Sequence, residues 1–280
     1  MQIDKKSIVI VIPVYKRELS ENERISLEQC VNILSDYALV IVKPESLSID
    51  NWMMKYPLLE TESFADQYFK GIRAYNRLVL SEEFYQRFSD YKYMLIYQLD
   101  AYVFSDELLF WCSKGYDYIG APWLPKKQKY LSLWGRTQTI FLGNFYLRFF
   151  PEKLKKEKGE YWNNTISNHK YYKYQVGNGG LSLRRIDKFL EITRAYRNSI
   201  DNWLSDDKPF YPEDLLLLIE LHHTPYALKK PSWKEALCFA IEENPLWAYT
   251  YNHQKLPFGC HAWFHPAYSS FWEAIIKSNK

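Results

Sequence analysis

The sequence predicts an α/β fold in which a mostly parallel central sheet is flanked by helices. The stretch 7–17 contains a β-rich apolar run, and Pro13 marks where that run ends. A helical pattern follows at 20–34, and a second apolar run covers 37–44. A strand, a helix and a strand at this spacing are typical of a parallel sheet. No internal repeat or low-complexity linker interrupts the 280 residues. We therefore expect a single domain over 1–280.

The other elements follow from hydrophobic spacing and helix-start signals. Ser20 and Glu23 form a capping-box pattern that predicts where the first helix begins. Residues 93–104 make the most hydrophobic strand, with polar Gln98 and Asp100 where it should leave the sheet. We expect further helices at 76–91, 106–113, 186–197 and 213–222, further strands at 116–123 and from 177, and an aromatic tail.

Composition and charge exclude some classes of protein. Hydrophobic residues make up 47% of the chain and charged residues 25%, so a globular core is available. The net charge of +3 is too small to indicate a nucleic-acid partner. The sequence has no CxxC pair and no apolar run near the ~18 residues of a membrane span, and its charged first residues MQIDKK are not what we expect of a secretory leader. We expect a cytoplasmic protein with reduced thiols.

Gln98 and Asp100 are the first candidate site residues. Residues two apart on a strand point to the same face, so both side chains should project together. Ligands of open α/β sheets bind outside the carboxyl ends of strands. Asp100 there can hold a hard divalent cation with diphosphate oxygens, and Gln98 suits a ribose hydroxyl. The alternative is a solvated strand end with incidental polar groups.

The stretch VGNGG at 176–180 concentrates three of the chain's ten glycines. Its spacing fits neither a P-loop nor a dinucleotide fingerprint. Because glycine lets a ligand approach the backbone closely, we expect a tight turn under a sugar, with Asn178 and backbone amides bonding hydroxyls. A plain turn between two elements is the alternative.

Glu213 and Asp214 open an apolar helix after Pro212. Proline and acids are favoured at helix starts for structural reasons alone. The functional interpretation is a carboxylate held rigidly at the helix start and facing a cleft, where it acts as a general base.

His261 lies in the aromatic loop LPFGCHAWFH, after Gly259. A fixed imidazole there is a candidate partner for Asp100 on an ion of the Mn²⁺ type. His265 competes for this role, and a structural histidine is the alternative interpretation.

The order of these features resembles the GT-A glycosyltransferase fold, whose landmarks are an acidic DxD-type motif, a glycine loop, an xED motif and a C-terminal histidine. More narrowly, the sequence resembles the DUF5672 family from about Arg73 to His261, and the first strand also agrees. The blocks that carry this resemblance are NRLVLSEEFYQRFSDYKYMLIYQLDAYVF, YDYIGAPW, VGNGGLSLRR, PEDLLL and PFGCHAW.

The resemblance implies a hexosyltransferase-type enzyme that uses a nucleotide sugar, with UDP as the donor nucleotide by family analogy. The residues expected to bind the donor are Pro13, Val14, Tyr15 and Lys16 beside the base, Gln98 near the ribose, Asp100 at the diphosphate, Gly179 and Gly180 beside the donor and acceptor sugars, and Arg73 and Asn76 reaching the donor. Asp214, or Glu213 as second choice, would deprotonate the acceptor hydroxyl, and His261 would complete the metal shell with Asp100.

One departure from the pattern concerns the metal. Gln98 stands where the DxD motif has its first acid, so the site has one negative charge fewer. Mn²⁺ or Mg²⁺ is still expected if the donor diphosphate supplies oxygen ligands. Turnover without a metal, with Lys or Arg neutralising the phosphates, is the alternative.

The resemblance also implies a reaction. The xED carboxylate favours single displacement with inversion, onto a hydroxyl of a saccharide or lipid-linked saccharide, in surface polysaccharide or glycoconjugate assembly. A sugar-nucleotidyltransferase would carry a Gly-rich loop after the first strand, and PVYKRELSENE has no glycine. A non-catalytic nucleotide-sugar-binding protein is the other alternative.

A basic, aromatic insertion is expected around 126–173. It has eleven Lys or Arg and three Asp or Glu, and its pattern predicts irregular, interrupted structure. Its aromatic and lysine-rich part, 137–159, has two interpretations. It is either an acceptor-side flap touching anionic lipid headgroups or a lipid-diphosphate-linked sugar, or an insertion packed on the sheet with solvated lysines. The first interpretation places a cytoplasmic protein peripherally at the inner face of the cytoplasmic membrane.

Overall fold

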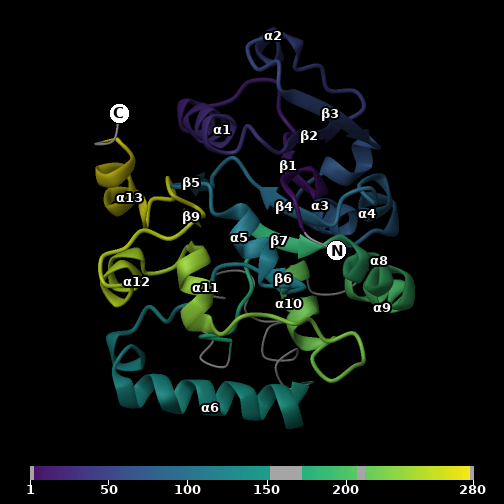
Figure 1. The fold of residues 1–280 in the computed structure, drawn as a ribbon. Coiled ribbons are helices and arrows are strands. Elements are labelled where there is room, and N and C mark those ends of the chain that lie inside the picture. Colours follow the sequence, from purple (N-terminus) through teal and green to yellow (C-terminus); the bar gives the residue numbers. More distant parts are fainter. Residues whose placement is uncertain (1–2, 152–171, 207–211, 278–280) are drawn as a thin grey trace.

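A six-stranded sheet forms the centre of the protein (Figure 1), in a computed structural model that describes residues 3–151, 172–206 and 212–277. The strand order is β3-β2-β1-β4-β7-β6, and β1 to β4 run parallel while β7 is antiparallel to both neighbours. The strands are β1 (Ile8–Pro13), β2 (Ala38–Pro44), β3 (Leu59–Phe64), β4 (Tyr93–Tyr97), β6 (Tyr118–Ile119) and β7 (Leu181–Arg185). The predicted mixed α/β fold with a mainly parallel sheet is confirmed.

The continuous apolar runs of β1 and β4 reflect burial of both sheet faces. Val9 and Val11 pack into one hydrophobic cluster, whereas Ile8, Ile10 and Ile12 pack into a second cluster on the other face. Strands covered on both sides have no solvent-facing positions, so they contain no polar alternation.

Helices cover the sheet much as the sequence indicates. The capping box predicted for Ser20 and Glu23 begins α1 (Glu21–Ile33). The single helix expected at 76–91 is instead two helices, because the Ser81 hydroxyl accepts a 3.1 Å hydrogen bond from the Phe84 amide and starts a new helix. These two are α3 (Ile72–Val79) and α4 (Glu82–Arg87). The others here are α2 (Asp50–Met53), α5 (Leu108–Ser113), α8 (Ile186–Ala195), α9 (Arg197–Trp203) and α10 (Glu213–Ile219).

The strand expected at 93–104 ends at Tyr97, and the chain then changes sheet. A turn closed by a 2.8 Å hydrogen bond from the Ala101 amide to the Gln98 carbonyl leads into β5 (Tyr102–Val103). This strand pairs with β9 (Gly259–Cys260), which pairs in parallel with β8 (Ala240–Ile241). This small second sheet lies next to the end of β4. The segments that follow β8 and β9 are therefore close to that end.

The expected aromatic tail is partly helical. It contains α11 (Trp233–Phe239), α12 (Pro245–Tyr251) and α13 (Ser269–Ile276). Their rings contact one another, as in the Trp233–Tyr251 pair with centroids 5.1 Å apart. Aromatic content in this region thus builds a third hydrophobic cluster.

The basic stretch is also more regular than expected. Its described part contains α6 (Leu133–Phe149), a helix of 17 residues that lies along one end of the molecule (Figure 1). The Ser132 hydroxyl accepts from the Gly135 amide at 3.2 Å and begins this helix. The lysines at 153–158 lie outside the described residues. Within the described parts of the chain, no helix is both long and apolar enough to cross a membrane.

Candidate active site

The strand order reverses between β1 and β4, which makes this position the topological switch point of the sheet. From β1 the chain proceeds to β2 and β3 on one side, whereas β4 lies on the other side next to β7. Ligands of open α/β sheets bind at such a point, outside the carboxyl ends of the strands. A cavity of about 360 Å³, the first cavity, opens there. It is lined by Pro13, Val14, Tyr15, Lys16, Leu19, Glu23, Phe69, Gly71, Ile72, Tyr75, Gln98, Leu99 and Asp100.

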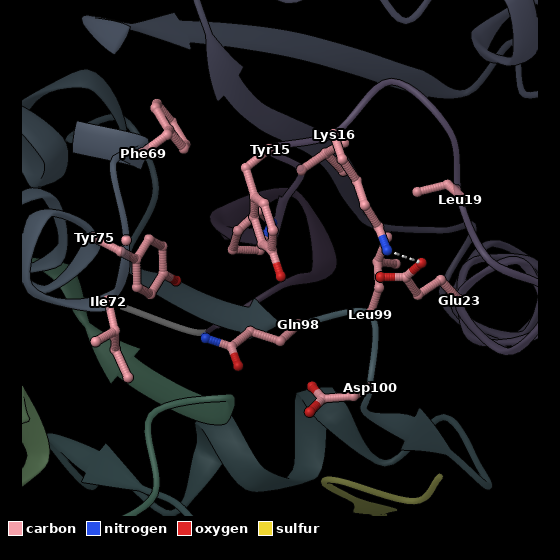
Figure 2. A pocket seen from close by; sticks show the side chains of 13 residues that line it. Tyr15, Lys16, Leu19, Glu23, Phe69, Ile72, Tyr75, Gln98, Leu99 and Asp100 are labelled. Atoms are coloured by element: carbon pink, nitrogen blue, oxygen red, sulfur yellow. Dashed lines mark ion pairs between the residues drawn. The ribbon is translucent and has the colours of Figure 1, made fainter. Parts of the chain in front are cut away.

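Aromatic rings and polar groups occupy different parts of the first cavity. Figure 2 shows the rings of Tyr15 and Tyr75 on one side and the Asp100 carboxylate on the other, with Gln98 between. Lys16 forms a 2.6 Å ion pair with Glu23, which holds the lysine at the cavity wall. The cavity thus offers ring surfaces for a planar group next to groups that bind oxygen-rich ligands or cations.

A second cavity of about 320 Å³ adjoins the first. Ile72, Tyr75 and Gln98 line both. The rest of its wall consists of Asn76, Trp123, Asn178, Gly179, Gly180, Pro212, Glu213, Asp214, Leu215, Glu242, Glu243 and His261. The end of β4, the glycine turn, the start of α10 and the chain after β9 therefore meet at one place.

His261 connects these segments. Its Nε2 lies 3.0 Å from Oδ1 of Asp100 and 3.3 Å from Oε1 of Gln98, and its Nδ1 lies 3.3 Å from Oε1 of Glu242. Burial alone would lower the pKa of His261, but the charge of Asp100 and hydrogen bonds to Asp100 and Glu242 raise it well above its usual value. Conversely, burial would raise the pKa of Asp100, and His261 outweighs that effect and lowers it.

The glycines of the turn make room for side chains of the site itself. A Cβ on Gly180 would lie 1.9 Å from Nε2 of His261, and a Cβ on Gly179 would lie 2.2 Å from Oε1 of Glu213. The left-handed residue of the turn is Asn178, with φ of 67°, and not one of its glycines. Close approach thus accounts for these two glycines, and the approaching groups are His261 and Glu213, while the approach of a sugar stays a prediction.

Asp214 is held by the same turn. Its Oδ2 accepts a 3.1 Å hydrogen bond from the Asn178 amide. The Asn178 side chain donates in turn to Glu242, and its Nδ2 is 3.3 Å from Nδ1 of His261. Asn178 therefore links Asp214 to the group around His261. Close by, burial lowers the pKa of Lys230 to about 8, although the charge of Asp214 acts in the opposite direction.

Glu213 is bound much more tightly than its neighbour. Its Oε1 forms a 2.6 Å ion pair with Arg184, which is fully buried, and its Oε2 accepts from the Asp214 amide at 2.9 Å. Both carboxylate oxygens of Glu213 are thus bonded within the protein, and the buried Arg184 charge has this carboxylate as its ionic partner. The two adjacent acids therefore have different partners.

Two expected donor-binding residues have other partners. Arg73 is not among the residues that line either cavity, and it donates to the Leu204 carbonyl at 3.3 Å and pairs with Asp206. Asn76 lines the second cavity, but its Oδ1 accepts from the Glu213 amide at 2.6 Å. Asn76 therefore supports the start of α10, and Arg73 supports the segment after α9.

Several residues of the site were not anticipated from the sequence. They are Trp123, Lys173, Arg184, Glu242 and Glu243, of which Lys173 and Glu243 form a buried 2.7 Å ion pair. The only sequence signal for the two glutamates is an acidic pair directly after the apolar run at 236–241.

The donor atoms around His261 can be compared with what a divalent cation needs. A carboxylate, an amide oxygen and an imidazole within 3.3 Å are suitable ligands for Mn²⁺ or Mg²⁺. Within the described residues, no three His, Cys, Asp or Glu side chains are grouped so that they could hold a metal ion. Asp100, His261 and Gln98 thus fit one side of an open site, whose other ligands would come from a bound molecule.

Solved structures share this fold at low sequence identity. Mouse xyloside xylosyltransferase 1 aligns over 90% of this chain and 96% of its own, with 11% identity and a TM-score of 0.51. An active-site mutant of LgtC aligns over 97% and 95%, with 10% identity and a TM-score of 0.51. Core-mannan synthase A from Aspergillus fumigatus, in its Mn/GDP form, has 12% identity and a TM-score of 0.42 over 70% of this chain, which spans 64% of that protein.

The fold that the chain shares with the xylosyltransferase and with LgtC is the GT-A glycosyltransferase fold. No curated protein sequence gives a significant match to the chain. The family model described as "Protein of unknown function (DUF5672)" matches residues 58–261, from β3 to the histidine of the site. That match covers well over half of the sequence, and the chain belongs to the DUF5672 family.

Proposed function

We propose that this protein is a hexosyltransferase-type glycosyltransferase. It moves a sugar from a nucleotide-sugar donor, UDP-linked by family analogy, to a hydroxyl of a saccharide or lipid-linked saccharide in surface polysaccharide or glycoconjugate assembly. The observation that carries the proposal is the convergence of Asp100, the glycine turn, Asp214 and His261 on two adjoining cavities. The shared fold of known glycosyltransferases supports it.

The first cavity suits the nucleotide part of the donor. Its aromatic surfaces, with Tyr15 largely exposed, can contact a base, and Pro13, Val14 and Lys16 complete that wall. Gln98 and Asp100 lie toward the second cavity, so the ribose and diphosphate would extend in that direction. The sugar then reaches Gly179 and Gly180, which line the second cavity.

The second cavity suits the acceptor and the base. Asp214 accepts the proton of the acceptor hydroxyl as that oxygen bonds to the anomeric carbon and the bond from this carbon to the diphosphate breaks. The Asn178 amide fixes the Asp214 carboxylate, and Glu213 fixes the Asp214 backbone. Attack opposite to the departing diphosphate gives inversion, which NMR of the product's anomeric configuration checks.

Asp100 and His261, with the Gln98 oxygen, would hold Mn²⁺ or Mg²⁺. When bound, the ion neutralises charge on the departing nucleoside diphosphate. His261 must lose its Nε2 proton for this role, so the cation and the proton compete for the same nitrogen. Lys16 is the cationic side chain of the first cavity and contributes positive charge from its wall.

The test is Asp214→Asn, which preserves the size of the side chain but removes its basicity. We expect nucleotide-sugar binding to remain and transfer to fall by about 10²–10⁴-fold, the usual contribution of a general base. Asp187→Asn is the matched control, because Asp187 is an exposed carboxylate bonded to Arg185 and lines neither of the two cavities.

Each outcome has a distinct meaning. Unchanged transfer by Asp214→Asn would remove Asp214 from the mechanism. Donor binding by the wild-type protein without transfer to any acceptor would favour a non-catalytic nucleotide-sugar-binding protein. Release of pyrophosphate from a nucleoside triphosphate and a sugar phosphate would identify a sugar-nucleotidyltransferase.

A further inference from the structure

One face of α6 carries a row of exposed aromatic side chains. Trp134, Phe141, Phe145 and Phe149 are 78%, 69%, 40% and 58% exposed. Their spacing of seven, four and four residues places them along one side of the helix. The three phenylalanine rings form a continuous row, with centroids 6.5 Å apart for Phe141–Phe145 and 5.1 Å apart for Phe145–Phe149. We call these four residues the aromatic ridge.

The opposite side of α6 attaches the helix to the protein. Its buried residues are Gly135, Thr139, Gly143 and Leu147, which repeat every four positions. At 100° per residue, this buried row is centred about 140° around the helix from the ridge. The ridge therefore faces away from the core and is not an incompletely packed part of it.

The segment that contains the ridge carries charge of a single sign. Residues 122–151 contain five Lys or Arg and not one Asp or Glu. Lys126, Lys127 and Lys129 are exposed before the helix, and Arg148 is exposed near its end. Arg136 instead packs over the Trp233 and Tyr251 rings. An exposed aromatic row with cations at both ends is complementary to a surface that is apolar below and anionic above.

We propose that α6 docks this protein onto an anionic lipid bilayer. The aromatic ridge enters the boundary between headgroups and acyl chains, while Lys126, Lys127, Lys129 and Arg148 contact lipid phosphates. The helix of 17 residues lies along the surface and does not cross it. A second copy of the chain is a less suitable occupant, because a symmetric contact through α6 would bring two sets of positive charges together.

The docking surface is connected to the site. Gln175, just before the glycine turn, donates a 3.0 Å hydrogen bond to Asn144 on α6. A bilayer at the ridge would therefore lie on the outer side of a helix whose flank contacts the segment before this turn, and the turn lines the second cavity, where a lipid-linked acceptor would have to reach. Docking itself does not depend on the proposed transferase activity, so the two can fail separately.

The test is co-sedimentation with vesicles of phosphatidylcholine mixed with phosphatidylglycerol, and with vesicles of phosphatidylcholine alone. We expect the wild-type protein to pellet with the anionic vesicles. Phe141→Ser with Phe149→Ser should lower the partition coefficient at least about tenfold, since two rings no longer leave water. Met54→Ser with Leu58→Ser is the control, because both residues are exposed near α2, at the end of the molecule far from α6 (Figure 1).

A charge variant separates lipid binding from unspecific hydrophobic adsorption. Lys126→Gln, Lys127→Gln and Lys129→Gln together should reduce binding to the anionic vesicles by up to about a hundredfold at low salt. No pelleting with anionic vesicles, equal pelleting with neutral vesicles, or equal loss in the control variant would overturn the proposal. Concentration-dependent dimerisation that the ridge variant abolishes, without vesicle binding, would overturn it too and assign the ridge to a second copy.

Discussion

Replacing Gly180 by alanine should displace the His261 ring from the site. The added Cβ would lie 1.9 Å from Nε2 and 2.5 Å from Cδ2 and Cε1 of that ring, far inside any allowed contact. The backbone of Gly180 cannot easily retreat, because its carbonyl accepts from the Gln98 amide at 2.8 Å and its amide donates to the Asn178 side chain at 3.0 Å. The histidine side chain must therefore move.

The size of the effect follows from the contacts that His261 loses. Its hydrogen bonds to Asp100 and Glu242 are both charge-assisted, and such bonds contribute about 1.5–3 kcal/mol each. Overpacking alone costs about 1–3 kcal/mol. We expect the free energy of unfolding to fall by about 3–6 kcal/mol, measured by urea denaturation, and stabilisation by Mn²⁺ with a nucleotide sugar to be lost.

A double-mutant cycle decides whether the clash is with His261. In a His261→Ala background the space is vacant, so Gly180→Ala should change the free energy of unfolding by less than about 1 kcal/mol. If alanine at position 180 is as destabilising in that background as in the wild-type protein, the reasoning about the glycine turn is refuted.

Two other changes test the supporting contacts. Glu213→Gln leaves the fully buried Arg184 without its carboxylate partner, so the free energy of unfolding in urea should fall by about 3–5 kcal/mol. The control is Glu191→Gln, because Glu191 is exposed and pairs with Lys188 at the surface; this change should alter the free energy of unfolding by less than about 1 kcal/mol. Burial would raise the pKa of Glu23, but bonds from Lys16 and Ser20 lower it below 4.5. The ionised Glu23 carboxylate therefore stabilises the folded protein above pH 4.5. Glu23→Gln should lower the free energy of unfolding by about 1 kcal/mol at such pH. Unfolding measured as a function of pH should show that this difference disappears as the pH falls below 4.5.

Local patterns are sufficient to predict much of the fold. The apolar runs form β1 and β2, and the Ser20–Glu23 box begins α1, because a buried strand and a helix cap each depend on a few adjacent residues. Gln98 and Asp100 are expected to face the same way on a strand, and they do converge on His261, but from a turn.

Features that depend on distant partners cannot be read from the sequence. Strands β8 and β9 have two residues each and exist only through pairing with each other and with β5, so no periodicity indicates them or places Glu242 beside His261. The sequence predicts irregular structure where α6 lies, whereas the helix packs closely on the protein through buried residues that include Gly135 and Gly143. Arg73 lies at the start of the region that resembles the family, yet its partners include Asp206 and the carbonyls after α9.

The most direct test of the central claim is a thermal-shift screen of nucleotide sugars, with and without Mn²⁺, on the wild-type protein and Asp100→Asn. We expect one donor to stabilise the wild-type protein by about 2.7 kcal/mol at a hundredfold excess over its Kd. The shift should grow with Mn²⁺ and be largely lost in Asp100→Asn. Absence of a shift with every nucleotide sugar, or an equal shift in both proteins, would contradict the assignment of the two cavities.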